Sequence, residues 1–572
     1  MTPAQILRET IKKDGKPERQ LKQYEAMGFV YGTPVSKFLD IGLKKGGTAV
    51  DKFGVTFIYP EDAPGRMPHI TAENKALKDI TKWKETVHAP DIAGNCQTGW
   101  EESLAKGEEI RKEGKLVSVV MGTGIFEQLH FLMGFEDTLT NLYEHPREMH
   151  RLIDYILRYR MSYAKTVIDN LHPDLILSHD DWGAKDALFM KEDMWREFFK
   201  EPYRKFYGYI RSQGVIAAHH ADSYCAPIVD DMAEIGIQIW QGVLPENNIP
   251  RLLAHLDGKL TLMGGVGASI DRADATEEEI RRYMKDVLWA DCPMGHFIPC
   301  ITYGLPGTVY KQVDPIIDDE IDRYNRVLHA PNFRKEEHRR IKAEKTVVKK
   351  EISVAGESET GDTLTQLAAA LKKGQKNRVL KLCNQAIEEN IDRQTILQKG
   401  LVAGMVSLGN DFSANKVFVP EMLMAARCMT AATEILKPLL VKGESKSAGK
   451  VCMGTVKGDM HDIGKNLVKI MMEGSGLTVI DLGTDVSAET FVDTAINENC
   501  DIICCSALLT TTMDEMKKVV ALAKEKGIRD KVKIMIGGAP ITQEYCDEIG
   551  ADIYTADAAA AAKRAVNALA NR

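Results

Sequence analysis

Four short apolar runs near the carboxy-terminal end place the strongest constraint on how this chain can fold. They are separated by helical stretches and followed by an alanine-rich segment, and they read KVCMGTV, LTVIDLG, DIICCSALL and KIMIGG. Short, continuous apolar runs that alternate with helices are typical of a parallel sheet buried on both faces. Residues 446–572 are therefore predicted to form a doubly wound, Rossmann-like α/β domain.

A charged stretch divides the rest of the chain. The segment Arg334–Thr363 is rich in Lys, Arg and Glu and ends in Gly, Ser, Glu and Thr, as solvated linkers do. We place the linker at residues 336–362. Residues 363–445 carry apolar positions at helical spacing and are predicted to form a helical cap bundle.

Residues 1–335 show a different alternation, in which short apolar runs are separated by longer amphipathic stretches. This pattern predicts a single (β/α)8 TIM barrel, so the whole chain is an α/β multidomain protein. The expected barrel strands include Lys115–Met121, Leu175–Ser178, Gly214–Ala218, Ile235–Trp240 and Leu260–Met263.

Charge and composition exclude several classes of function. The formal net charge of -8 offers no basic surface for DNA or RNA. We find neither an apolar run long enough to span a membrane nor an apolar core typical of a secretory signal at the start. The 11 cysteines are scattered without a CxxC pair, which indicates a reduced compartment and favours ligand roles over disulfides. We expect a cytoplasmic protein with no nucleic-acid or membrane partner.

Three motifs follow three strands of the predicted carboxy-terminal sheet. The segment Gly458–Asn466, GDMHDIGKN, comes after the first strand, Ser506–Leu508 after a later one, and Gly537 and Gly538 after the next. Carboxyl ends of parallel strands meet at one edge of an open sheet, where ligands bind. The DxHxxG, SxL and GG set, together with the helical segment before it, resembles the cobalamin-binding domain of methionine synthase and the corrinoid proteins of anaerobic methyl metabolism.

That resemblance implies a bound corrinoid (cobalamin) with His461 as the lower ligand of cobalt. It implies that Asp459 accepts the imidazole N–H and that the Thr512 hydroxyl takes part in a proton relay. The remaining implied contacts approach the nucleotide tail of the cofactor or line its slot, and they are Gly464, Gly537, Gly538, Ser506 and Leu508. The alternative is a surface histidine with ordinary turn glycines.

The helical segment offers two bulky side chains for the upper face of the corrin. By the same resemblance, Phe418 and Met424 shield the position of the methyl group. A Phe and Met stripe at helical spacing also suits an ordinary helical core. If the two residues form a shield, we expect the cap to swing aside on the linker before the cobalt meets the barrel.

Four stretches before the linker resemble the uroporphyrinogen decarboxylase superfamily, which includes methyltransferases that serve corrinoid proteins. They are Gly122–Glu127, His179–Gly183, His220–Asp222 and Gly304–Thr308. The arginine-rich amino-terminal signature of the decarboxylases is missing, which disfavours tetrapyrrole decarboxylation and favours the methyltransferase branch.

In that branch a His-x-Cys pair and a distant Cys bind zinc. Here the matching residues are His220, Asp222 and Cys300, which remain a workable zinc set. A carboxylate makes the metal harder than a thiolate would and favours an oxygen-bearing substrate. The alternatives are a hydrogen-bonded core pair of His219 and His220, and an inert buried thiol at Cys300.

Further candidates surround this zinc set. Asp180 and Asp181, counted with His220 and Asp222 as catalytic candidates, either position substrate or cap a helix. Aromatic side chains near the expected strand ends either line an apolar pocket or pack in the core, and they are Trp182, Trp240 and Tyr303.

The layout resembles the two-domain corrinoid methyltransferase of chloromethane use. It implies transfer of a methyl group from a small donor to Co(I) of the chain's own corrinoid, through a methylcobalamin/Co(I) cycle in one-carbon metabolism. A methoxylated aromatic compound is favoured narrowly over chloromethane. Expected partners are a second methyltransferase that passes the methyl to tetrahydrofolate or a thiol, and an ATP-dependent reductive activator. The alternatives are a methyl-corrinoid to thiol methyltransferase and a corrinoid storage or sensing protein.

Overall fold

A computed structural model describes most of the chain. The described residues are 1–61, 65–272, 274–303, 309–328, 362–413, 416–436, 449–459, 463–508, 512–538, 540–555 and 558–570. Contacts divide the chain into two units, one formed by Met1–Tyr59 with Arg66–Ser353 and the other taking in Val354–Arg572. The predicted linker, except for Asp362, lies outside the described residues, as do the Gly304–Thr308 motif and His461.

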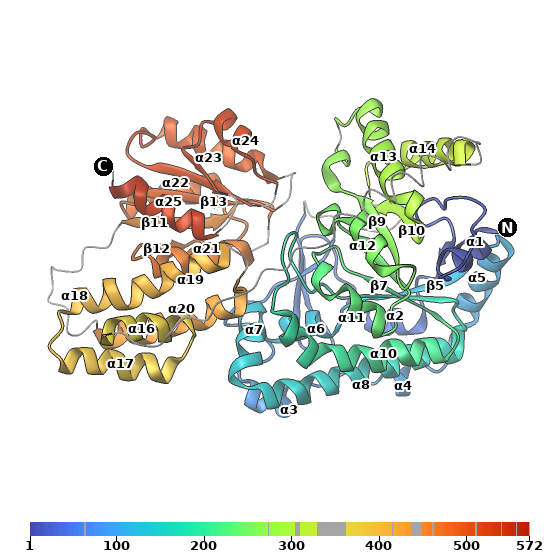
Figure 1. Ribbon diagram of the computed structural model, residues 1–572, viewed down its shortest axis with the longest axis horizontal. Coiled ribbons are helices and arrows are strands. Elements are labelled where there is room, and N and C mark those ends of the chain that lie inside the picture. The colour runs from blue at the N-terminus through green and yellow to red at the C-terminus, as the bar shows by residue number, and fades with distance from the viewer. Residues whose placement is uncertain are drawn as a thin grey trace. The chain divides into compact units, whose positions relative to one another are not determined.

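The first unit is built on a curled parallel sheet with helices around its outside (Figure 1). In the described part of the chain its strands pair in the order β1-β5-β6-β7-β8-β9-β10, so neighbours in sequence are neighbours in space, as in a (β/α)8 barrel. The strands are β1 (Met27–Phe29), β5 (Leu116–Met121), β6 (Leu175–His179), β7 (Ile216–His220), β8 (Ile239–Val243), β9 (Thr261–Val266) and β10 (Phe297–Ile301).

Helices connect these strands and bury apolar stripes against them. The longest, α8, buries a stripe of Leu, Ile and Val side chains along its length. The helices of this unit are α1 (Pro3–Thr10), α2 (Pro34–Leu39), α3 (Trp83–Thr86), α4 (Ile92–Asn95), α5 (Glu101–Lys112), α6 (Ile125–Met133), α7 (Phe135–Glu144), α8 (Pro146–Leu171), α9 (Glu192–Trp195), α10 (Glu201–Ser212), α11 (Val229–Glu234), α12 (Ile249–Leu256), α13 (Glu277–Asp291) and α14 (Val313–Leu328). A small antiparallel sheet joins β2 (Gly47–Val50), β3 (Thr56–Tyr59) and β4 (Met67–Pro68).

In the part of this unit that the structure describes, side chains and not strand pairing link the two ends of the curled sheet. The Gln20 amide donates to the carbonyl of Phe297 at 2.8 Å, and the Gln23 amide oxygen accepts from the N–H of Ile301 at 3.3 Å. Both glutamines precede β1, and both partners lie on β10. Backbone groups at the β10 edge are thereby satisfied without a further strand.

The predicted strand positions agree with the structure with one shift. Ile235–Trp240 was expected to be a strand, but Ile235 ends helix α11 and Gly236 turns the chain at a φ of 104°. The strand β8 therefore begins only at Ile239. The first part of this run is the end of a helix and the last part is the start of a strand. Both parts are buried, which explains why the whole run is apolar.

The second unit contains a parallel sheet of doubly wound topology, with strand order β12-β11-β13-β14-β15 among its described residues. The strands are β11 (Lys450–Thr455), β12 (Thr478–Asp481), β13 (Ile502–Ser506), β14 (Lys533–Gly537) and β15 (Ile553–Tyr554). Its helices are α21 (Ile463–Gly474), α22 (Ala488–Asn497), α23 (Asp514–Glu525), α24 (Gln543–Ile549) and α25 (Ala558–Ala570).

A helical bundle packs against α21 and α25, the helices that cover one face of this sheet (Figure 1). Met405 and Leu408 of the bundle share a buried apolar cluster with Met472 of α21 and Met453 of β11. The bundle helices are α16 (Thr363–Lys372), α17 (Lys376–Glu388), α18 (Arg393–Thr395), α19 (Ala403–Ser413) and α20 (Val419–Leu436). The bundle and the sheet therefore fold around one core, while a separate cluster covers the opposite face of the sheet.

Candidate functional site

The three predicted motifs of the second unit lie at one edge of its sheet. Thr455 pairs with Ser506, and Ser506 pairs with Gly537, so β11, β13 and β14 end at the same level. Gly458 follows the first of these strands and Gly538 follows the last. The sheet thus brings together motif residues that lie about 80 positions apart in sequence.

Asp459 holds two of these segments together. Its carboxylate is fully buried and accepts the N–H of Leu508 at 2.7 Å and the Thr512 hydroxyl at 3.1 Å. The neighbouring loop is fixed by Asp485, which accepts the N–H of Gly458 at 2.7 Å and donates its own N–H to the carbonyl of Asp459 at 3.0 Å. The structure therefore joins Asp459 to Thr512, and the contribution of Asp485 was not anticipated from the sequence.

Two glycines at this edge have distinct reasons to be glycine. A Cβ on Gly538 would lie 1.8 Å from the carbonyl oxygen of Ala507, and its φ is 131°. A Cβ on Gly464 would meet nothing within 4 Å, so this exposed position faces open space. Ser506 is half-buried and Leu508 is 43% exposed, which leaves an apolar side chain uncovered at this edge of the sheet.

The two predicted cap residues lie at the start of α20. The N–H of Phe418 donates to Glu421 at 3.0 Å, which begins the helix, and the Phe418 side chain is half-buried. Met424 lies in the second turn of the helix. A Cβ built on Gly374, in the turn between α16 and α17, would lie 2.8 Å from the Cβ of Met424. Met424 therefore packs closely within the bundle as well.

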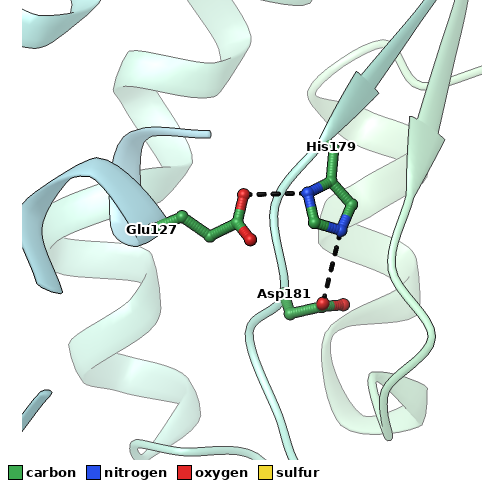
Figure 2. A group of neighbouring side chains, drawn as sticks. All are labelled: Glu127, His179 and Asp181. Atoms are coloured by element: carbon green, nitrogen blue, oxygen red, sulfur yellow. Dashed lines mark ion pairs between the residues drawn. The ribbon is translucent and has the colours of Figure 1, made fainter. Parts of the chain in front are cut away.

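In the first unit, a polar cluster forms where strands β5 and β6 end. Glu127 lies in the first turn of α6, His179 is the last residue of β6, and Asp181 follows two residues later. Figure 2 shows the imidazole between the two carboxylates. Nδ1 of His179 is 2.9 Å from Glu127, and Nε2 is 3.5 Å from Asp181. One potential ligand atom from each of the three residues lies within 4.8 Å of the others.

Electrostatics in this cluster keeps a positive charge on His179. Burial lowers the pKa of His179, but the negative charge of Glu127 and a hydrogen bond to Asp181 raise it well above its usual range. Burial raises the pKa of Glu127, yet the charge on His179 lowers it to about 2. These effects favour an imidazolium at His179, between the two carboxylates.

Asp180 occupies a different position from Asp181. It is fully buried and accepts the backbone N–H groups of Phe126 and Glu127, each at 2.9 Å, at the start of α6. The Trp182 indole N–H, at 3.1 Å, and the Tyr203 hydroxyl also donate to it. Of the two predicted catalytic aspartates, Asp180 therefore anchors the helix that carries Glu127, and Asp181 joins the cluster.

His220 lies beside the cluster at the end of β7. Its ring centre is 4.7 Å from that of His179, and its Nδ1 is hydrogen-bonded to the amide oxygen of Gln241. Because an amide oxygen only accepts, Nδ1 carries the proton and Nε2 keeps its lone pair. Burial, with the nearby charge of His179, lowers the pKa of His220 and favours this neutral form.

Gln241 extends this contact into the barrel interior. Its Nε2 donates to the Tyr24 hydroxyl at 3.0 Å, and Tyr24 is hydrogen-bonded to the Cys300 thiol. Cys300 is fully buried in an apolar core cluster, and that burial raises its pKa. The thiol is thus linked to His220 only through two intervening side chains.

The predicted zinc set therefore separates in space. Among the described residues, His220, Asp222 and Cys300 do not form a three-ligand group, because the thiol lies in the apolar core. Asp222 is half-buried, and burial together with the negative charge of Asp181 raises its pKa to about 7. Asp222 therefore interacts electrostatically with the cluster of Glu127, His179 and Asp181, whereas Cys300 lies in the apolar core.

The aromatic residues expected to line a pocket are mostly buried. Trp182 and Trp240 are fully buried, and their indole N–H groups donate to Asp180 and to the carbonyl of Ala221. Tyr303 is half-buried and donates to Asp271 at 2.7 Å. The two tryptophans pack in the protein interior and do not line an open pocket.

Another aromatic pair, not anticipated from the sequence, lies at the carboxyl end of β1. The Phe29 ring packs against Tyr24 at 5.8 Å and stacks with Tyr31 at 6.0 Å, and Tyr31 is 65% exposed. Tyr24 is hydrogen-bonded to Gln241, and Gln241 is hydrogen-bonded to His220. A continuous path of contacts therefore runs from the exposed Tyr31 ring to the polar residues at the strand ends. The signal in the sequence was the FVY run after a short apolar strand.

Known protein families match both units of the chain. Models described as "B12 binding domain" match residues 363–437 and 449–566. A dimethylamine corrinoid protein of Methanosarcina barkeri is 44% identical over 210 residues, which cover 36% of this chain and 98% of that protein. The second unit belongs to the corrinoid protein family.

The barrel of this corrinoid fusion matches a different family. A model described as "Uroporphyrinogen decarboxylase (URO-D)" covers residues 48–329. The chain has the layout of a corrinoid-dependent methyltransferase fused to its cofactor domain.

Comparison with solved structures finds partial matches to this chain. The monomethylamine corrinoid protein of Methanosarcina barkeri is 34% identical, with a TM-score of 0.24, over 36% of this chain and 98% of that one. A methyltransferase from Methanosarcina mazei is 14% identical, with a TM-score of 0.42, over 57% of this chain and 99% of that one.

The described residues of the corrinoid unit fit a cobalamin. Open space at Gly464, the close approach at Gly538 and the uncovered Leu508 leave room for a bulky tail beside backbone. Asp459 and Thr512 are already joined at the base of the same edge.

Within the described residues of the corrinoid fusion, we find no helix with the length and apolar character to cross a membrane.

Proposed function

We propose that this protein removes the methyl group of a methoxylated aromatic compound and passes it to the corrinoid held by its own second unit. Chloromethane is the closest competing donor. A second methyltransferase then moves the methyl group to tetrahydrofolate or a thiol, and an ATP-dependent activator restores the reduced cofactor. These partners follow from the resemblance to corrinoid methyltransferase systems.

One observation carries the choice of donor. The polar groups at the strand ends of the barrel are carboxylates and imidazoles, and Cys300, the candidate thiol, is buried in the core. Oxygen and nitrogen groups create a hard, charged environment that suits a leaving oxygen or halide better than sulfur. The stacked rings of Phe29 and Tyr31 favour a donor with a planar aromatic ring over a single-carbon halide.

The residues of this chain have separate tasks in the reaction. Bound corrinoid supplies a Co(I) nucleophile toward the methyl carbon. Tyr31 and Phe29 contact the ring of the donor, and the positive charge held between Glu127 and Asp181 stabilises the negative charge that develops on the leaving oxygen. His461 would hold the cofactor from below, and Asp459 with Thr512 would support that ligand.

Tethering both centres in one chain supports transfer within a single molecule. A linker raises the effective concentration of one centre at the other without any new contact between them. We expect the predicted linker at 336–362 to allow the cap residues Phe418 and Met424 to move away before transfer.

A donor panel tests this function. The full chain, loaded with cobalamin and reduced to Co(I), is incubated separately with a methoxyphenol, chloromethane, dimethyl sulfide and dimethylamine, and the cobalt absorption is followed. Dimethylamine is included because relatives of the second unit carry that name. We expect the absorption change with the methoxyphenol, less with chloromethane and none with the others.

An Asp181→Asn variant provides the matched control. It should bind cobalamin as the wild type does and lose the donor-dependent change. A change with dimethyl sulfide or dimethylamine alone would contradict the oxygen-or-halide assignment. No change with any donor, with transfer from methylated cofactor to a thiol instead, would favour the reverse reaction. No transfer in either direction would favour storage or sensing.

A further inference from the structure

The cluster at the strand ends has more negative than positive groups. Three carboxyl groups, those of Glu127, Asp181 and Asp222, lie within electrostatic reach of one imidazole, that of His179. Glu127 is only 8% exposed, and Asp222 is half-buried. Carboxyl groups withdrawn from water require compensating positive charge, and one imidazole supplies at most a single unit of it.

The geometry of three of these residues suits a cation. Glu127, His179 and Asp181 each offer one ligand atom, and the three atoms lie within 4.8 Å of one another. In Figure 2 the carboxylates of Glu127 and Asp181 lie on either side of the His179 imidazole, each beside one ring nitrogen. An imidazole nitrogen and two carboxylate oxygens form a ligand set that zinc accepts, with a fourth position left open.

The surrounding structure fixes these ligands in place. The N–H of Gly124 donates to the Glu127 carboxylate at 3.1 Å, and Asp180 binds the backbone N–H of Glu127 at 2.9 Å. A Cβ on Gly124 would lie 2.1 Å from the side chain of Asp180, so the loop and the aspartate are closely packed. Such outer contacts orient metal ligands and tune their affinity.

An oxygen of the cluster and a nitrogen beside it are available to a cation. Oδ1 of Asp181 is buried and has no hydrogen-bond partner among the described residues. His220 is held in the tautomer that leaves Nε2 as an acceptor, and its ring lies 4.7 Å from that of His179. Buried acceptors without donors are uncommon and indicate a missing partner.

We propose that Glu127, His179 and Asp181 bind one divalent cation of the zinc class, with His220 beside the open position. The cation takes the place of the proton on one ring nitrogen of His179, so positive charge remains at the same place. This assignment replaces the set of His220, Asp222 and Cys300 expected from the sequence. It rests on the ligand geometry and not on the proposed donor, because metal binding can be measured without methyl transfer.

Metal stoichiometry provides the first test. The full chain is stripped with a chelator, reloaded with Zn²⁺, freed of excess metal and analysed for zinc per chain. We expect one zinc in the wild type and in Cys300→Ser, and less than a tenth of that in Glu127→Gln and Asp181→Asn. Circular dichroism and cobalamin content confirm that each variant is folded. No zinc in the wild type, or loss of zinc in Cys300→Ser alone, would overturn the assignment.

X-ray absorption at the zinc edge provides a second test that needs no variant. Zinc bound by nitrogen and oxygen has neighbours at about 2.0–2.2 Å, whereas a thiolate ligand adds sulfur at about 2.3 Å. We expect the first pattern without sulfur in the reloaded wild type. A sulfur shell would assign the metal to a cysteine and contradict the proposal. Because binding is read without any methyl donor, an inactive protein that holds zinc would count against the proposed function alone.

Discussion

The two strand edges of this protein place their functional groups in different ways. At the edge of the corrinoid unit, close backbone approach at Gly538 and open space at Gly464 shape the site, and Asp459 is tied to Leu508 and Thr512. At the barrel edge, side chains of α6, β6 and the segment after β6 form a charged cluster, and one oxygen of Asp181 has no hydrogen-bond partner in the described part of the chain. The first edge is shaped to receive a large cofactor, and the second concentrates charge.

The largest effect is expected from Gly538→Ala. The new Cβ would lie 1.8 Å from the carbonyl of Ala507 at a φ of 131°, so the backbone must move. Strain at such a position costs about 1–3 kcal/mol, and the steric clash adds to it. Thermal unfolding should show a clear loss of stability, and purified protein should contain less than a tenth of the wild-type cobalamin.

Gly537→Ala is the matched control for this edge. Its Cβ would meet the Thr555 carbonyl at 3.7 Å, which is an ordinary contact. The variant should unfold at the wild-type temperature. Equal stability of the two alanine variants would show that close backbone approach does not shape this edge.

At the barrel edge, Asp180→Asn and Asp181→Asn should separate stability from activity. An amide in place of the buried Asp180 carboxylate accepts fewer of the donors at the start of α6, which should reduce the free energy of unfolding by about 2–4 kcal/mol. Asp181→Asn should change stability by less than about 1 kcal/mol and abolish donor-dependent transfer. Denaturant unfolding and the cobalt absorption assay measure the two effects, and the same pattern from both variants would refute the division of roles.

This contrast explains how much could be predicted from the sequence. The corrinoid edge was predictable because each motif directly follows its own strand, so Gly458, Ser506 and Gly537 had to meet at one edge. Five barrel strands followed from their apolar runs, apart from the helix end at Ile235, whereas β1 and β10 were not among the expected strands.

The ligand geometry at the barrel edge was not predictable in the same way. Glu127 and His179 both lie in recognised stretches, but their meeting depends on how Asp180 anchors α6 against β6. Cys300 was a reasonable candidate by residue type, yet its position on β10 directs it into the apolar core. Contacts between separate loops and strands decide both outcomes, and residue spacing alone does not report them.

His461→Ala should weaken the corrinoid edge without destroying it. The backbone that shapes the tail slot remains, so cobalamin affinity should fall by about tenfold to a hundredfold, or about 1.4–2.8 kcal/mol. The cobalt spectrum should change because the lower ligand is lost. An unchanged spectrum with cofactor bound would exclude His461 as that ligand.

The smallest effect is expected from Tyr31→Ala. This exposed ring stacks on Phe29, and its loss should weaken binding of a methoxyphenol by about 1 kcal/mol, a few-fold rise in KM. Transfer from chloromethane should not change, since it has no ring to contact. A matching loss with both donors would show that Tyr31 acts on something other than the aromatic ring.

The dependence of the methyl transfer rate on protein concentration tests the central claim most directly. The cobalamin-loaded chain is reduced to Co(I), mixed with saturating methoxyphenol, and followed by cobalt absorption at several protein concentrations. If the barrel serves the corrinoid of its own chain, the first-order rate constant stays the same at every concentration. A rate constant that rises in proportion to protein concentration would mean that the two sites meet only between molecules, and would contradict the account.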